Sequence, residues 1–119
     1  MPQPKSRLRV REEGDVLLVS LVDRSILDET TVQEIGDEIG KLIDAQPQPR
    51  FVVSFAEVEH LSSPSLGALI ALHNKIRGKN GQLRLADMSP KIHQIFVVTQ
   101  LDTLFAIHPT SEEAVAGMA

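Results

Sequence analysis

The chain has 119 residues, of which 42% are hydrophobic and 24% charged, and its formal net charge at pH 7 is −4. This length predicts one domain with one core, and the negative charge without a basic stripe excludes broad binding to nucleic-acid phosphates. The sequence contains no cysteine, which excludes disulfides, thiolate catalysis and zinc–sulfur sites. No apolar run approaches the about 20 residues of a membrane span, and no secretory leader is recognisable, so we expect a cytoplasmic protein without membrane contact.

The N-terminal part predicts a short arm followed by a hairpin. Residues 1–6 hold two prolines and no periodicity, which indicates a flexible arm before a single domain at 7–119. Alternation over residues 7–11, a turn at 12–15 and an apolar strand at 16–22 are typical of an antiparallel hairpin. The alternation assigns one face to Leu8 and Val10, and the opposite, solvated face to Arg7, Arg9 and Arg11.

Helices and strands alternate along the rest of the chain. At 28–45 apolar residues recur at helical spacing, and either Asp28 or Thr30 can cap that helix. Ser89-Pro90 and Thr110-x-x-Glu113 mark two further helix starts. The other expected elements are helices at 64–77, from 90 onward and at 111–117, and strands at 51–55, 82–87 and 101–107. The sequence therefore predicts an α/β fold with a mixed sheet of four to five strands and about four helices packed on it.

The most informative segment joins a buried strand to the helix at 64–77, where Ser62, Ser63 and Ser65 stand at the expected helix start. A helix N-terminus presents unpaired N–H groups and about half a positive charge. A hydroxyl placed there can cap the helix, act as a nucleophile or accept a phosphate. In the first interpretation Ser63 is the N-cap, which contributes about 1 kcal/mol, and Pro64 occupies the first helical position.

In the second interpretation Ser65 is the nucleophile of a small serine hydrolase. Ser65-Leu66-Gly67 supplies half of the G-x-S-x-G elbow in the strand–turn–helix context that hydrolases use. Asp102 and His108 would then serve as acid and base, although Ser63 stands where the elbow needs its first glycine.

In the third interpretation a serine of this turn is phosphorylated. A phosphoserine carries about −1.5 to −2 charges at pH 7, and a helix N-terminus favours such an anion. The fold would tolerate the phosphate, whereas a protein docked on the same surface would be repelled. The turn would then be a switch that needs little internal rearrangement.

Two segments carry a family resemblance. The strand FVVSFAEVEHL leads into a turn whose Leu66-Gly67 matches the end of the pattern Asp-Ser-Ser-Gly-Leu-Gly, and residues 81–105 hold a second matching segment around Ser89-Pro90 and Leu101-Asp102. In these features the chain resembles the STAS family, the domain shared by sulphate transporters and bacterial anti-sigma factor antagonists. The resemblance runs from about residue 8 to residue 115.

Counting back from Leu66-Gly67, Ser63 falls on the serine that is phosphorylated in that family, with Ser62 as the second choice. Ser62 replaces the aspartate of the family pattern, Pro64 its second serine and Ser65 its glycine. The resemblance implies a non-enzymatic regulatory module that binds a serine-kinase-type anti-sigma factor and thereby releases a sigma factor. The partner, not this chain, would hold the ATP, so no cofactor is expected here. The implied docking surface comprises Ser62, Ser63, Ser65 and Leu66.

Other functions stay open at this point. The altered turn is also compatible with a constitutive STAS scaffold that is never phosphorylated, and with a variant that binds a lipid or a nucleotide. Self-association into a homo-oligomer is equally undecided.

The remaining polar residues predict no site. The four histidines share no ligand spacing, so we expect no metal centre, and His73 should be half-buried and hydrogen-bonded near the apolar face of its helix. Glu34, Asp37 and Glu38 should form a solvated helix face.

Overall fold

The computed structural model describes residues 7–118, so the expected arm at residues 1–6 and the last residue of the expected domain lie outside the described part. Within it, a sheet of five strands has the order β1-β2-β4-β6-β7. These strands are Leu8–Glu13, Val16–Leu21, Arg50–Ser54, Gln82–Ala86 and Ala106–His108. β1 pairs antiparallel with β2, and each later neighbour is parallel, which confirms the predicted hairpin and mixed sheet.

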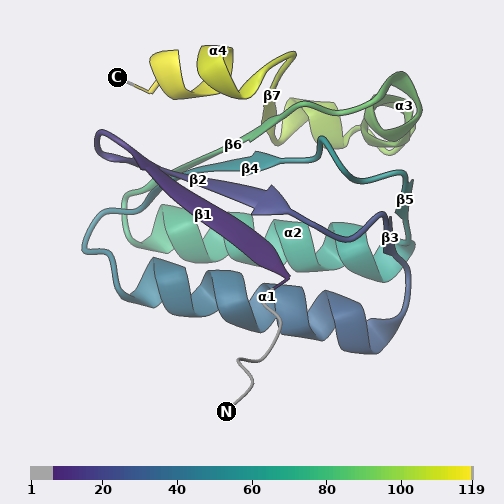
Figure 1. Ribbon diagram of the computed structural model, residues 1–119, viewed down its shortest axis with the longest axis horizontal. Helices are drawn as coiled ribbons and strands as arrows, with labels where there is room; N and C mark the ends of the chain where they lie inside the picture. Colours follow the sequence, from purple (N-terminus) through teal and green to yellow (C-terminus); the bar gives the residue numbers. More distant parts are fainter. Residues whose placement is uncertain (1–6, 119) are drawn as a thin grey trace.

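The helices cover both faces of this sheet. They are α1 (Glu29–Asp44), α2 (Ser63–Gly78), α3 (Pro90–Val98) and α4 (Ser111–Ala116), with a 3-10 turn η1 at Leu101–Thr103. Figure 1 shows α1 and α2 side by side below the sheet and α4 above it. Because α1 and α2 each connect parallel strands, they run in the same direction and begin at the same end of the sheet.

Side-chain alternation along the strands divides the core into two clusters. In β2, Val19 and Leu21 belong to the main cluster under α1 and α2, whereas Val16 belongs to the smaller cluster under α4. The central strand β4 is buried on both faces, as its continuous apolar run predicts. The smaller cluster consists of Val16, Val52, Ala86, Ala114 and Met118.

Polar side chains begin each long helix. Asp28 caps α1, since its carboxylate accepts hydrogen bonds from the Thr31 hydroxyl at 2.7 Å and the Thr31 N–H at 3.1 Å. Both bonds lower the pKa of Asp28 from its usual value, and the bond from the Thr31 hydroxyl has the larger effect. Ser89 caps α3 by accepting from the Ile92 N–H, as the Ser89-Pro90 pair predicts.

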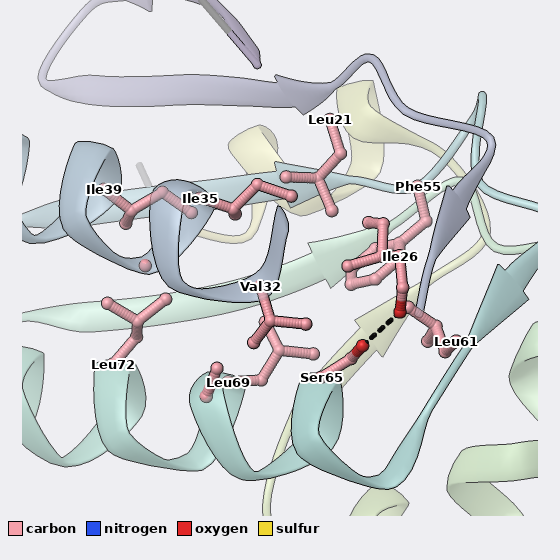
Figure 2. Close-up of a pocket in the computed structure, with 12 residues that line it drawn as sticks. Leu21, Ile26, Val32, Ile35, Ile39, Phe55, Leu61, Ser65, Leu69 and Leu72 are labelled. Atoms are coloured by element: carbon pink, nitrogen blue, oxygen red, sulfur yellow. Dashed lines mark hydrogen bonds between the residues drawn. The ribbon is translucent and has the colours of Figure 1, made fainter. Parts of the chain in front are cut away.

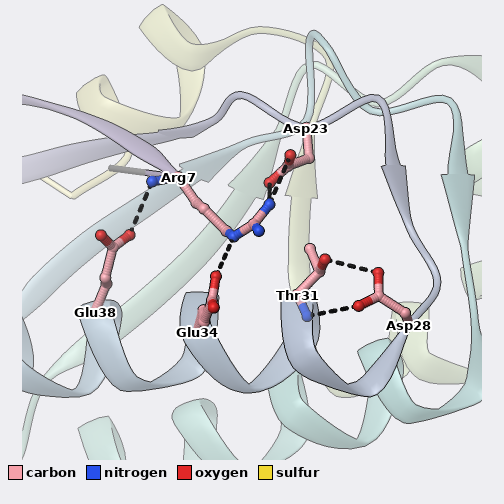
Figure 3. Close-up of polar contacts among 6 residues, drawn as sticks. All are labelled: Arg7, Asp23, Asp28, Thr31, Glu34 and Glu38. Carbon is pink, nitrogen blue, oxygen red and sulfur yellow. Dashed lines mark hydrogen bonds and ion pairs between the residues drawn. The ribbon is translucent and has the colours of Figure 1, made fainter. Parts of the chain in front are cut away.

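The tertiary structure corrects the expected outer face of the hairpin. Figure 3 shows that Arg7 is not a solvated decoration, because its guanidinium pairs with Asp23 at 3.0 Å and Glu34 at 2.6 Å. The Arg7 N–H also donates to Glu38, so these two helix carboxylates are not simply solvated. The hydrogen bond to Glu34 raises the pKa of Arg7 most, and the hydrogen bond to Asp23 raises it further. The network ties the start of the described chain to α1.

Val10 is a second correction at this edge. It shares a face with Leu8 but is 46% exposed, whereas Leu8 is buried. β1 starts beside α1 and runs away from the helices toward the hairpin turn (Figure 1), and Val10 lies further along this edge strand than Leu8 does.

Three short elements differ from the sequence expectation. The segment 101–107 is not one edge strand but η1 followed by β7. Two parallel two-residue strands, β3 (Ser25–Ile26) and β5 (His60–Leu61), were not predicted. A ladder of two residues leaves no periodicity in the sequence to detect. It nevertheless places the chain before α1 next to the chain before α2, which shapes the site described below.

The carboxylate of Asp87 links α4 to the sheet by hydrogen bonds. It follows β6 with a positive φ of 63°, and its carboxylate accepts hydrogen bonds from the Ser54 hydroxyl at 2.6 Å and the Ser111 N–H at 2.9 Å. The Ser111 hydroxyl donates to it as well. The last residue of β4 and the first turn of α4 therefore share one acceptor.

Candidate functional site

The serine turn builds the first turn of α2. The helix begins at Ser63, and the extended residue before it, Ser62 (φ −115°, ψ 169°), is the N-cap. The expectation that Ser63 is the N-cap is therefore wrong by one residue, and Pro64 stands second in the helix. Ser62 and Ser65 cap the turn together, since the Ser62 N–H donates to the Ser65 Oγ at 3.3 Å and the two hydroxyls lie 3.0 Å apart.

Ser65 faces the interior. Only 4% of its surface is exposed, and its hydroxyl donates to the backbone carbonyl of Ile26 in β3 (Figure 2). The expected place of Ser65 on the docking surface is therefore wrong. Ser65 replaces the glycine of the family pattern, and its hydroxyl links the start of α2 to the unpredicted strand β3. Half-buried Ser62 faces the same carbonyl at 3.4 Å.

The same geometry contradicts the serine-hydrolase interpretation. The Ser65 hydroxyl is buried and committed to the Ile26 carbonyl, so a substrate cannot reach it. The expected base, His108, contacts Arg84 on the neighbouring strand, with Nε2 2.9 Å from the guanidinium nitrogen. Asp102 lies exposed in η1. The three residues form no hydrogen-bonded triad.

Ser63 is the serine that the fold leaves accessible. It is exposed, and within residues 7–118 no hydrogen bond involves its side chain. Pro64 and Gly67 are exposed beside it, whereas Leu66 is half-buried against the main core cluster. The exposed surface of the first turn thus centres on Ser63, Pro64 and Gly67, two of which the sequence interpretation had not assigned to it.

A shallow groove of about 310 Å³ runs between α1 and α2 and reaches this turn at Pro64. Its floor is made of small or apolar side chains, and Glu29, Asp37 and Lys75 lie along its length. Beneath it, an apolar pocket extends toward Ser65 between the two helices (Figure 2). Sequence reasoning missed the groove, although the repeated small residues Gly36 and Gly40 on α1 were a detectable signal.

His73 differs from its expectation. It is only 8% exposed, and neither ring nitrogen has a hydrogen-bond partner in the described part of the chain. Its ring packs edge-on against Phe105 at 5.2 Å between centroids. Burial, and then the nearby charge of Arg77, lower the pKa of His73, so the ring is neutral at pH 7.

Residues 7–118 offer neither a metal-binding cluster nor a helix that could span a membrane. Histidine, aspartate and glutamate side chains form no cluster of three that could hold a metal ion there. Over the same residues, every helix is too short or too polar to cross a membrane.

Comparisons with known proteins place these features in context. The model of the STAS domain family matches residues 7–114. A STAS-domain containing protein of Pseudomonas aeruginosa is 34% identical over 58 residues, which cover 49% of this chain and 57% of that protein. A STAS domain protein from Planctomyces limnophilus, described as an anti-sigma-factor antagonist, superimposes with a TM-score of 0.85 at 23% identity, covering 98% of this chain and all of the other.

A second solved structure is the Bacillus cell fate determinant SpoIIAA in its phosphorylated form. It superimposes with a TM-score of 0.71 at 16% identity, over 94% of this chain and 99% of SpoIIAA. At this level of identity the two structures establish a shared fold.

Proposed function

Because this chain belongs to the STAS domain family, we propose that it is a regulatory protein-binding module of the anti-sigma factor antagonist type, switched by phosphorylation of Ser63. Its partner is a serine-kinase-type anti-sigma factor, which holds the ATP and which this chain draws away from a sigma factor. The proposal extends to this chain what the solved relatives are described to be: an anti-sigma-factor antagonist and a phosphorylated SpoIIAA.

The proposal rests on the different environments of the three serine side chains. Ser62 and Ser65 use their hydroxyls inside the turn, on each other and on the Ile26 carbonyl. Ser63 is exposed and has no such commitment within residues 7–118. Modification of Ser63 therefore breaks no hydrogen bond of the fold, whereas modification of Ser65 would require the turn to open. This favours Ser63 over Ser62 as the phosphoacceptor.

The position of Ser63 also explains how a phosphate acts as a switch. α1 and α2 begin at the same end of the sheet, so two helix N-termini offset the added negative charge there (Figure 1). The fold is therefore expected to tolerate the phosphate. A docked protein, by contrast, must desolvate a dianion that it was not shaped to meet, and this weakens binding.

The groove between α1 and α2 supplies the rest of the docking surface. It joins the Ser63 turn at Pro64, and its small side chains allow a partner backbone to approach closely. Gly67 fits the same role, because a Cβ there would meet nothing within 4 Å in this chain. The fold does not need glycine at Gly67, which supports a requirement imposed by a partner.

The test compares variants for binding to the anti-sigma kinase in a calorimetric titration. We expect Ser63→Asp to weaken binding at least tenfold and Ser63→Ala to change it less than twofold. Ser62→Asp is the matched control, because it adds the same charge one residue earlier at a position where aspartate is a good N-cap. Equal weakening by Ser62→Asp and Ser63→Asp would contradict a specific switch at Ser63.

Incubation of the chain with the kinase and ATP separates the switch from the scaffold alternative. Fragment mass spectrometry should find one phosphate on Ser63 in the wild type and none in Ser63→Ala. Binding without phosphate transfer would show a constitutive scaffold, and the regulatory part of the proposal would then be wrong.

A further inference from the structure

The loops that follow β6 and β7 diverge to opposite faces of the sheet. After β6 the chain enters α3, whose buried residues Ile92 and Phe96 join the main cluster on the α1 and α2 side. After β7 it enters α4, whose Ala114 joins the cluster on the other side. In α/β sheets, a crevice forms at the carboxyl ends of neighbouring strands where the connections leave in opposite directions, and ligands bind in such crevices.

A cavity of about 350 Å³ lies at this point. This volume is within the range of small-molecule sites. Four of its lining residues are apolar or proline, and the other two are histidines from different elements. The lining consists of Met88, Pro90, His93, Ile107, His108 and Pro109. The cavity thus has apolar walls and two imidazoles, and no residue of the Ser63 turn lines it.

Arg84 determines what His108 can do. Its guanidinium nitrogen lies 2.9 Å from the Nε2 of His108. Arginine has only donors, so Nε2 must accept, and in the neutral ring the proton is on Nδ1. The remaining nitrogen of His108 can therefore donate but cannot accept or ligate. A guanidinium in contact with the ring also repels a second cation.

Acidic side chains are missing from this lining among the described residues. The nearest carboxylate in sequence, Asp87, is occupied by hydrogen bonds from Ser54 and Ser111. The donors of the cavity therefore face no anion of the protein within its walls. A ligand with a carboxylate or another acceptor group, attached to an apolar body, matches both the donors and the walls.

We propose that the cavity between α3 and β7 binds a small apolar monoanion, of the class of aromatic carboxylates, with His93 and His108 as donors to its acid group. Arg84 is a positioning residue, because it fixes the donor form of His108. The lining includes no residue of the Ser63 turn, and the proposal does not rest on the switch.

The experiment titrates the protein with benzoate and follows backbone amide and imidazole signals by NMR. Benzamide is the matched neutral probe, since it keeps the ring and removes the charge. Benzoate should shift the signals of Met88, His93 and His108 at concentrations at least fivefold lower than benzamide does. Contacts between the benzoate ring protons and the methyl groups of Met88 and Ile107 should appear in nuclear Overhauser spectra, which requires no variant.

Variants then test the donors. His93→Phe and His108→Phe keep an aromatic ring and remove the donor, and each should weaken benzoate binding at least fivefold. His60→Phe, at an exposed histidine that contacts Lys91 of α3 but does not line the cavity, should change it less than twofold. Equal responses to benzoate and benzamide, or shifts scattered over the surface, would overturn the proposal. Coordination of zinc chloride by His93 and His108 at lower concentrations than benzoate would overturn it as well, because it requires acceptor nitrogens.

Discussion

At the residue scale, three serines within four positions have three different environments. Ser62 is the half-buried N-cap, Ser63 is exposed, and Ser65 is buried against the Ile26 carbonyl. The difference arises because the first helical turn rotates successive side chains by about 100°, so only one of the three points away from the protein. Two serines thus maintain the turn, and the third is available to a partner or a kinase.

This division predicts unequal losses of stability for two similar truncations. Ser65→Ala removes the donor to a buried carbonyl and the acceptor for the Ser62 N–H, and should lower the free energy of unfolding by about 1–3 kcal/mol. Ser63→Ala should change it by less than about 0.5 kcal/mol, because the side chain is exposed. Urea denaturation measures both. A comparable loss in the two variants would contradict the assigned roles.

At the element scale, glycines show which segments are fixed by the fold. Gly36 lies inside α1, where a Cβ would meet nothing within 4 Å. Gly81 follows α2, where a Cβ would lie 2.2 Å from the Pro49 carbonyl oxygen. The second glycine allows the chain after α2 to pass close to the chain before β4, and the Gln82 N–H donates to that same carbonyl at 2.8 Å.

We therefore predict opposite signs for two glycine substitutions. Gly36→Ala should raise the free energy of unfolding by about 0.5–1 kcal/mol, since alanine loses less backbone entropy in a helix. Gly81→Ala should lower it by more than about 1 kcal/mol, because backbone atoms must move to admit the Cβ. Thermal and urea unfolding of the two variants check the prediction, and stabilisation by Gly81→Ala would show that the close approach is not required.

At the scale of the whole molecule, two apolar clusters lie on the two faces of one sheet, and global stability depends on both. One buried histidine packs against the larger of the two clusters. His73 is buried there against Phe105 without a hydrogen-bond partner in the described residues. Because its pKa is lowered in the folded state, the unfolded chain takes up the proton first as the pH falls.

The free energy of unfolding should therefore decrease as the pH falls through about 6.5, the pKa of histidine in an unfolded chain. The slope from this one proton is at most about 1.4 kcal/mol per pH unit. His73→Phe, which keeps a ring beside Phe105, and His73→Leu should both reduce this pH dependence in urea unfolding between pH 7.5 and 5. His60→Gln, at an exposed histidine, is the control. An unchanged pH profile in both His73 variants would rule out His73 as its source.

Several features could be predicted from the sequence because local patterns determine them. The hairpin, the order of helices and strands, and the caps at Asp28, Ser89 and Thr110 follow from periodicity and from residues adjacent in the chain. The position of the serine turn at the start of α2 follows in the same way, to within one residue. The cap hydrogen bonds each join residues three positions apart, so the local sequence alone is enough to predict them.

Only the tertiary structure decided which of these residues face solvent and which face one another. Ser65 became buried because strand β3 brings the Ile26 carbonyl to it from 39 residues away. Arg7 contacts Glu34 of α1 from 27 residues away, and the pairing of β6 with β7 brings Arg84 to His108 from 24 residues away. Burial and long-range pairing depend on how the helices and strands pack in three dimensions. Patterns among neighbouring residues of the sequence therefore do not predict them.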